Sequence, residues 1–336
     1  MTPPLQMAVV GCGGIASYAA GLARLLPGLR LNACCDLDGE LAAGFARRHA
    51  IPAVYQDYAR LLEEGQPDIV YLAVPHDLHL PMTRAAVERG AAVLCEKPIA
   101  ASMEAGRELL RLSQQPGARV AINYQNRYET TCYQFVQAAR SGAMGRIQHA
   151  RANIPWRREP GYFATGAGWH SSLARSGGGT LLTQGSHYID LLLWAMSSPP
   201  VAASGVIRQV LHTGVEVEDL AFGLIELENG AVIDVCSTMA SPKEKEVTIE
   251  LYGEKGIAYW KAGRTPSLRW EGVKPPAVRP PTAGLHALQR SIAGIRDWVR
   301  GGPPHLASAA DALTTLSAVD AVYRSARSGK RETIEL

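Results

Sequence analysis

Residues 7–122 alternate short, continuously apolar runs with amphipathic segments of about ten residues. Runs that are apolar throughout are typical of strands covered on both faces, and their alternation with helices predicts a parallel, doubly wound sheet. The predicted strands are Met7–Val10, Leu29–Cys35, a short element around Val54, Ile69–Val74, Ala91–Cys95 and Arg119–Ile122. The predicted helices are a segment after Gly14, Gly39–His49, Tyr58–Glu64, Leu80–Arg89 and Met103–Gln114.

The pattern changes after Asn123. Strand-like runs now follow one another closely and are linked by turns such as Asn229-Gly230, which predicts a large, mostly antiparallel sheet. The predicted elements are Thr131–Arg140 (helix), Ile147–Ile154 (strand), Leu181–Met196 (helix), the strands Val201–Val210, Leu220–Leu227, Ala231–Ser237, Val247–Tyr252 and Gly256–Trp260, and, after the Pro-rich segment Pro275–Pro281, the helices Leu285–Val299 and Ala309–Ser325. We therefore expect two α/β domains, over residues 1–122 and 123–336.

A glycine-rich motif stands between the first strand and the first helix. Its sequence, Gly11-Cys-Gly13-Gly14-Ile15-Ala16, matches G-x-G-x-x-A, in which backbone and a helix N-terminus approach a pyrophosphate. Asp36, 20 residues past Ala16, is placed to accept a hydrogen bond from a ribose 2′-hydroxyl, and no Arg follows it directly, so NAD is favoured over NADP. The alternatives are a glycine turn without a ligand and an Asp36 that only caps the next helix.

The loops after the fourth and fifth strands are expected on the nicotinamide side of such a sheet. We predict cofactor contacts from Val74, Pro75, His76, His79 and Glu96, in addition to the glycine motif and Asp36. Lys97 is the polar group best placed to reach the reacting carbon, although a lysine at a strand end is commonly a solvated rim residue. His76 and His79 have the spacing of a metal-binding pair, but no third ligand with suitable spacing appears, so no metal site is predicted.

These motifs, with Gly177-Gly-Gly-Thr-Leu-Leu-Thr183-Gln-Gly-Ser-His187-Tyr-Ile-Asp190, together resemble the glucose-fructose oxidoreductase / inositol dehydrogenase / rhizopine-catabolism (Gfo/Idh/MocA) family. The resemblance implies a Rossmann domain for NAD and a second domain for substrate binding and oligomerisation. It also implies oxidation or reduction of sugars, cyclitols or sugar nucleotides. It identifies Lys97 and His187 as the catalytic pair, and a Lys–Pro bond that is often cis. Many members carry Asp where this chain has Thr183, which argues against an inositol-type substrate.

Oxidation of a secondary alcohol needs a proton acceptor for the hydroxyl and a hydride acceptor for the carbon. A histidine suits the first role and NAD the second, while a cationic lysine stabilises a developing alkoxide. We assign His187 as acid/base and Lys97 as electrostatic anchor and proton-relay partner, roles that can be exchanged. Asp190, one turn after His187, either orients it or packs in the helix.

A polar and aromatic stretch precedes the glycine run, with Tyr162 at its centre. Its residues predict either an ordinary surface loop or a substrate wall, in which rings stack on sugar faces and Arg binds carboxylate or phosphate. The predicted substrate-binding residues are Trp156, Arg157, Arg158, Trp169 and His170, with Arg127 and Thr183. If the arginines line the pocket, the substrate carries an anionic group.

Composition limits the remaining functions. A net charge of +3 with scattered Lys and Arg argues against nucleic-acid and membrane partners, and six cysteines without metal-type spacing fit a reducing compartment. No signal peptide or spanning apolar run is apparent, so we expect a cytoplasmic protein, and the resemblance suggests a homodimer or homotetramer formed through the C-terminal sheet. Two other functions stay open: an NAD-dependent glycoside hydrolase and a non-catalytic NAD-sensing regulator.

Overall fold

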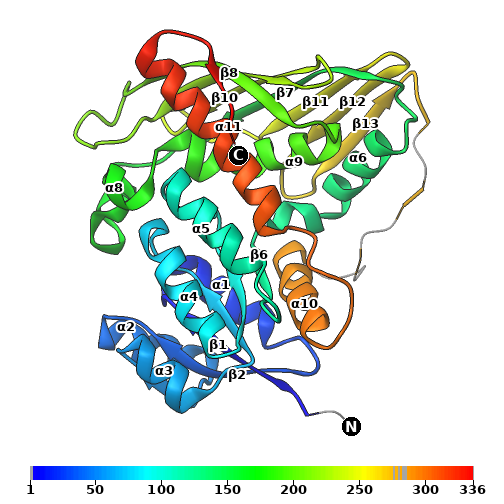
Figure 1. Ribbon diagram of the computed structural model, residues 1–336. Helices are drawn as coiled ribbons and strands as arrows, with labels where there is room; N and C mark the ends of the chain where they lie inside the picture. The colour runs from blue at the N-terminus through cyan, green and yellow to red at the C-terminus, as the bar shows by residue number, and fades with distance from the viewer. Residues whose placement is uncertain (1–2, 275–276, 279–280, 282–285, 336) are drawn as a thin grey trace. The chain divides into compact units, whose positions relative to one another are not determined.

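The computed structural model describes residues 3–274, 277–278, 281 and 286–335 (Figure 1). The Pro-rich segment predicted at Pro275–Pro281 falls partly outside these residues, as does Leu285, the predicted start of a helix. The chain forms two compact units. Unit 1 contains residues 1–100, 104–128 and 281–310, and unit 2 contains residues 101–103, 129–280 and 311–336.

Unit 1 is built on a six-stranded parallel sheet with the order β3-β2-β1-β4-β5-β6, which confirms the doubly wound prediction. Its strands are β1 (Leu5–Val10), β2 (Leu29–Cys35), β3 (Ala53–Tyr55), β4 (Ile69–Leu72), β5 (Ala92–Cys95) and β6 (Val120–Ile122). Its helices are α1 (Gly14–Ala23), α2 (Gly39–His49), α3 (Tyr58–Gly65), α4 (His79–Glu88), α5 (Met103–Ser113) and α10 (Ala287–Val299). Every residue of β4 and β5 is buried, because helices cover both faces of the sheet.

Unit 1 also contains a helix that the sequence places far from its sheet. The apolar face of α10, with Leu288, Ile292 and Ile295, lies in the same hydrophobic core as Ala16 and Ala19 of α1. The division of the chain therefore differs from the single boundary predicted at residue 122. A sequence pattern shows that a helix has an apolar face, but it does not show which core buries that face.

Unit 2 is built on an eight-stranded sheet with the order β13-β12-β11-β7-β10-β9-β8-β14, in which only β7 and β10 pair in parallel. Its strands are β7 (Ile147–Pro155), β8 (Pro200–Arg208), β9 (Leu220–Leu227), β10 (Val232–Thr238), β11 (Thr248–Gly253), β12 (Gly256–Lys261), β13 (Ser267–Glu271) and β14 (Glu332–Thr333). The mostly antiparallel sheet was predicted. Strands β13 and β14 were not, because both are short and rich in polar residues.

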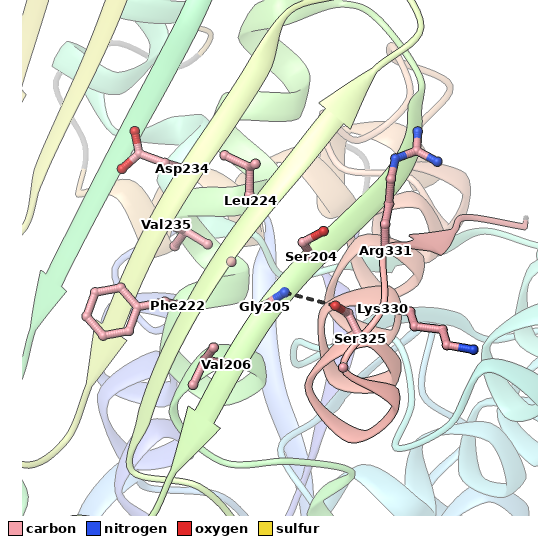
Figure 2. A pocket seen from close by; sticks show the side chains of 12 residues that line it. Ser204, Gly205, Val206, Phe222, Leu224, Asp234, Val235, Ser325, Lys330 and Arg331 are labelled. Carbon is pink, nitrogen blue, oxygen red and sulfur yellow. Dashed lines mark hydrogen bonds between the residues drawn. The ribbon is translucent and has the colours of Figure 1, made fainter.

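One face of this sheet is covered by helices α6 (Thr130–Arg140), α9 (Ser186–Met196) and α11 (Ala309–Ser328) (Figure 1). Helix α11 approaches the sheet closely where Gly205 of β8 pairs with Gly223 of β9: a Cβ on Gly205 would lie 2.5 Å from the Val322 side chain. The Gly205 N–H donates to the Ser325 hydroxyl, 3.1 Å away, as Figure 2 shows. The glycine pair therefore sets how near this helix packs.

The opposite face of β8 and β9 carries exposed apolar side chains. Strand alternation turns Ala221 and Ile225 towards the helices, while Phe222 (50% exposed) and Leu224 (44%) lie on the other side with Val206 (45%). Within the described part of the chain, no helix is both long and apolar enough to span a membrane.

Candidate active site

The glycine motif forms a tight turn with an open helix N-terminus. Gly11 has φ +83°, and a Cβ there would lie 2.2 Å from the Ala73 carbonyl oxygen, so only glycine fits. A Cβ on Gly13 or Gly14 would meet nothing within 4 Å. No side chain caps the first N–H groups of α1, and its first turn holds no acidic residue. This cradle fits a pyrophosphate bound by backbone N–H groups.

The residues that follow in α1 differ in exposure. Ala16 is fully buried where α1 meets the core, and Ile15 is 42% exposed beside the cradle. These positions agree with the roles expected in a G-x-G-x-x-A motif, close packing at the alanine and open surface at the residue before it.

Asp36 lies at the carboxyl end of β2 and is tied to the glycine motif. Its Oδ2 accepts from the Cys12 N–H at 2.8 Å, and its Oδ1 accepts from the Asp38 N–H at 3.0 Å. The cap of α2 is Asp38, which accepts from Glu40 and Leu41. Asp36 is therefore not the helix cap, which removes the alternative role considered for it.

The loop after β4 brings Val74, Pro75, His76 and His79 together. Val74 and Pro75 are half-buried, whereas His76 is 4% and His79 0% exposed. The His79 Nδ1 lies 2.9 Å from the Pro98 carbonyl and its Nε2 lies 3.1 Å from the Val74 carbonyl. Burial lowers the pKa of His79 to about 4, against the opposing effect of these carbonyls. We therefore reassign His79 from cofactor contact to a buried link between two loops, which also leaves it no nitrogen for a metal.

Glu96 and Lys97 follow β5. The buried Glu96 carboxylate accepts from the Tyr71 hydroxyl at 2.5 Å and from the Asn123 side-chain amide at 2.6 Å. Lys97 is half-buried, and the Lys97–Pro98 peptide bond is cis, as the resemblance implied. With its carboxylate occupied inside the core, Glu96 supports the turn and leaves Lys97 as the cationic side chain at its surface.

In unit 2, the glycine run before α9 is held by a buried carboxylate. Glu218 accepts from the Gly179 N–H at 2.8 Å, the Leu181 N–H at 2.9 Å and the Tyr323 hydroxyl at 2.9 Å. Burial raises the pKa of Glu218, although these hydrogen bonds oppose the rise. A Cβ on Gly179 would lie 1.8 Å from the Glu218 carbonyl oxygen, so the glycine allows this close approach.

The helix predicted at Leu181–Met196 begins with a π-helical turn, Leu181–Gly185, and continues as α9. Thr183 lies in the π turn, 6% exposed, and its hydroxyl is hydrogen-bonded to the Gly179 carbonyl at 2.7 Å and to the Gln184 side chain. His187 is half-buried on α9, and Asp190 is fully buried. Because a π turn widens the helix, Thr183 and His187 do not have the simple one-face relation that an α-helix predicts, and such turns are frequent at functional sites.

The aromatic stretch forms a stacked cluster next to the π turn. The Arg158 guanidinium lies 4.6 Å from the centre of the Trp156 ring and 5.5 Å from that of Tyr162. His170 stacks on Tyr162 at 4.3 Å, and Trp169 lies 3.8 Å from His170 between ring centres. Burial raises the pKa of Tyr162, while Arg158 and a hydrogen bond with Gln184 act in the opposite direction. The Gln184 contact joins this cluster to the π turn.

Two of the predicted substrate-binding arginines have partners within their own units. Arg127 is 2% exposed and donates to the Leu306 carbonyl at 2.7 Å. Arg157 donates to the Glu159 carboxylate at 2.7 Å and to the Pro242 carbonyl. Arg158 is the member of the predicted trio that lies within the aromatic cluster.

Comparisons with known proteins agree with this architecture. Residues 5–124 match a family described as the oxidoreductase family with an NAD-binding Rossmann fold, and residues 134–259 match the GFO/IDH/MocA C-terminal domain. Together the two matches span most of the chain, in the order that the family has. The chain belongs to the Gfo/Idh/MocA oxidoreductase family.

Relatives in this family resemble the chain over almost its whole length. The D-apiose dehydrogenase of Paraburkholderia graminis is 26% identical, over 98% of this chain and 89% of that protein. The D-glucoside 3-dehydrogenase of Escherichia coli is also 26% identical, over 98% and 97%. The WlbA dehydrogenase from Bordetella pertussis, solved with NADH and UDP-GlcNAcA, is 25% identical over 99% of both chains, with a TM-score of 0.88.

As a member of the Gfo/Idh/MocA family, the chain is an NAD-binding oxidoreductase, and the glycine cradle and Asp36 in unit 1 fit that cofactor.

Several residues that shape the site were missed by sequence reasoning. Tyr71 and Asn123 hold Glu96, Glu218 and Tyr323 hold the glycine run, and Gln184 joins the aromatic cluster. Their partners are 22 to 105 residues away in the chain, so no local spacing indicates them. The glycine run itself indicates that another segment approaches its backbone closely, but it does not indicate which segment.

Proposed function

We propose that the protein transfers a hydride between NAD(H) and the secondary alcohol or ketone of a sugar, cyclitol or sugar nucleotide. The relatives support this class, because they include sugar dehydrogenases and a dehydrogenase solved with a nucleotide-linked sugar acid. The cradle at Gly13 and Gly14 supports NAD as the bound cofactor.

The observation that carries the proposal is the choice of lysine at position 97. Lys97 is the only lysine among the first 242 residues. Apart from histidines, every other basic residue in that stretch is an arginine. An arginine stays protonated, whereas a lysine can lose its proton at accessible pH. The single exception stands at the carboxyl end of β5, where the fold predicts the reacting carbon.

Each side chain has one chemical task in this proposal. Bound NAD supplies the hydride acceptor. The imidazole of His187 accepts the hydroxyl proton. Lys97 stabilises the negative charge that develops on the substrate and exchanges a proton as relay partner, which an arginine cannot do. In the reductive direction the same groups return the proton. The two roles can be exchanged, and the variants described in the Discussion distinguish them.

The substrate wall in this proposal is the aromatic cluster with Thr183 and Gln184. Rings such as Trp156 and Tyr162 offer flat apolar faces to a sugar, and Arg158 offers a charge to a carboxylate or phosphate. Because Arg127 and Arg157 have local partners, the proposed anionic group rests on Arg158 alone.

The test is NADH formation, followed by absorbance, with NAD and a panel of sugars, cyclitols, sugar acids and nucleotide sugars. Sustained reduction of NAD by at least one alcohol is the expected result. A single burst of reduction that does not accumulate would instead indicate the hydrolase alternative. Tight NAD binding with no reduction by any member of the panel would favour the regulator and contradict the proposal.

We also propose that copies of the chain associate through the uncovered face of the unit 2 sheet. Val206, Phe222 and Leu224 line a groove of about 550 Å³ on β8 and β9, shown in Figure 2. Apolar side chains grouped in this way are typical of an interface. Light scattering after gel filtration should show a dimer or tetramer that Phe222→Glu dissociates, while Leu25→Glu, at a residue 71% exposed in unit 1, does not. A monomeric wild-type protein would contradict this assembly.

A further inference from the structure

The turn that carries Lys97 is held through its first residue. The Oε1 atom of Glu96 accepts from both Tyr71 and Asn123, and its Oε2 accepts from the Lys97 N–H at 3.3 Å. Burial raises the pKa of Tyr71 well above its usual value, so this hydroxyl keeps its proton and donates. The carboxylate thus joins β4, the residue that follows β6 and the backbone of Lys97.

A second row of buried side chains fixes the direction of the Asn123 amide. The Ser291 hydroxyl donates to the Asn123 Oδ1 at 2.6 Å, so its only proton is used there. The His305 Nε2 lies 3.0 Å from the same hydroxyl, and its Nδ1 lies 3.2 Å from the Ala307 nitrogen and 3.3 Å from the Ala307 carbonyl oxygen. Burial lowers the pKa of His305 to about 4, which keeps the ring neutral. With Oδ1 occupied, the NH₂ group of Asn123 points to Glu96.

The turn is also held on its other side. His79, at the start of α4, lies between the carbonyls of Pro98 and Val74, and a neutral ring donates to one of them. The ring has no exposed surface, so no water competes for these positions. The residues on both sides of Lys97 are therefore attached to buried groups of the same unit.

We infer that His79 and Asn123 are positioning residues, which hold the Lys97 turn from its two sides so that the ammonium is presented in one orientation. This inference rests on the role proposed for Lys97. A long, flexible side chain is effective in catalysis only where its base is fixed, because misplacement by about 1 Å can cost on the order of a hundredfold in rate. Neither residue needs to touch cofactor or substrate for this purpose.

The experiment observes Lys97 directly, without turnover. The full-length chain, saturated with NAD, is reductively methylated with ¹³C-formaldehyde, and the relaxation rates of the ¹³C-methyl signals are measured by NMR. The chain has seven lysines, and Lys97→Arg assigns the signal of interest. We expect the Lys97 methyl groups to relax at least about twice as fast as those of the exposed Lys255, because a side chain whose base is fixed moves less freely than a surface side chain.

The variants are His79→Leu and Asn123→Leu, which remove the donors and keep apolar volume. Each should bring the Lys97 relaxation rate to within about 20% of the Lys255 rate, since a released side chain moves as freely as any surface lysine. The milder His79→Asn and Asn123→Ser replace them if either protein fails to fold. Matched controls are His49→Leu, which removes the buried partner of the Ser17 hydroxyl, and Asn32→Leu, which removes an amide donor to the Gly65 carbonyl.

The inference is overturned if the Lys97 methyl groups relax like those of Lys255 in the wild-type protein, or if the controls change the Lys97 rate as much as the variants do. A change in only one variant removes the other residue from the proposal. The result is independent of the proposed function: a chain that oxidises no alcohol would contradict that function and leave the NMR comparison valid. Where turnover is found, the variants should lower kcat about tenfold or more with little change in the KM for NAD.

Discussion

The two sheets of the protein bury their strands differently. In unit 1, Ile69–Leu72 and Ala92–Cys95 are buried at every residue, because helices lie on both faces. In unit 2, the side chains of β9 alternate between buried and exposed: Ala221 and Ile225 are buried, whereas Phe222 and Leu224 are exposed. The first sheet has no free face, so its chemistry is confined to the ends of its strands. The second sheet keeps one face open.

The two units also hold their predicted site residues by different means. Strand ends and their following loops carry Asp36 and Lys97 in unit 1. In unit 2, His187 and Thr183 belong to a helix, and a buried Glu218 holds the glycine run at its start. A parallel sheet thus specifies where a site will be, whereas an open sheet supports a helix whose first turn depends on buried polar contacts. The predictions below test this contrast, from the largest expected effect to the smallest.

The largest effect should come from one residue of each unit. Lys97→Ala and His187→Ala should each lower turnover by about 10²–10⁴-fold, because each removes a group proposed to act on the substrate oxygen. Lys97→Arg keeps the positive charge but removes the titratable amine. This variant should therefore be more active than Lys97→Ala if Lys97 is only an electrostatic anchor. The measurement is steady-state kinetics, with NADH affinity by fluorescence unchanged as the control. Normal turnover in either alanine variant would remove that residue from the mechanism.

Acid should weaken unit 1 before unit 2. Burial lowers the pKa values of His79 and His305 to about 4. The folded protein therefore has its full stability above pH 6.5, where both rings are neutral, and loses stability as the pH falls from 6.5 towards 4. The loss is on the order of 3 kcal/mol for each ring. Glu218 has the opposite sign, since its raised pKa favours the fold at low pH and this contribution is lost as pH rises through that pKa.

Hydrogen exchange followed by mass spectrometry separates the two units in this test. Between pH 6.5 and 4.5, after correction for the intrinsic exchange rate, protection should fall more in β4 and β5 than in β9 and β10. His79→Asn should reduce the acid sensitivity of unit 1. Equal loss of protection in both units would show that the buried histidines do not determine the difference.

Cofactor choice tests the strand-end site of unit 1. NAD(H) should bind at least tenfold more tightly than NADP(H), about 1.4 kcal/mol, because the Asp36 carboxylate repels a 2′-phosphate. Asp36→Ser combined with Leu37→Arg should narrow or reverse this preference in a binding titration. Asp38→Ala is the matched control, which removes the α2 cap and costs about 1 kcal/mol of stability with the preference unchanged. Equal affinities in the wild-type protein would contradict the assignment.

The smallest effect concerns the aromatic cluster of unit 2. Arg158→Gln should raise KM for an anionic substrate about three- to tenfold with kcat nearly constant, as expected for the loss of a uniform binding contact. Arg157→Gln is the control, because its side chain pairs with Glu159 and Pro242 and should leave KM unchanged. If neutral sugars react as well as acidic ones and Arg158→Gln changes neither KM nor kcat, the cluster has only a structural role.

The sequence alone predicted most of the elements near the site. Leu29–Cys35, Gly39–His49 and Leu220–Leu227 have the predicted bounds, because their periodicity and flanking turn residues are local properties. Residues with a local sequence signature, such as Gly11 and Gly13 of the G-x-G-x-x-A motif, could also be predicted. The π turn at Leu181–Gly185 was not, since an apolar helical pattern does not indicate an inserted residue.

What the sequence determined by itself is the order of most strands and helices, the glycine motif and the identity of the titratable groups, because each is recorded in residue types and spacings within short stretches of the chain. Only the tertiary structure decided that α10 belongs to unit 1, that His79 is buried between two carbonyls, and that Asn123 and Glu218 hold their turns from a distance. Arg158 rather than Arg127 lies in the aromatic cluster for the same reason. Burial and hydrogen-bond partners are set by which segments pack together, and that information is distributed along the whole chain.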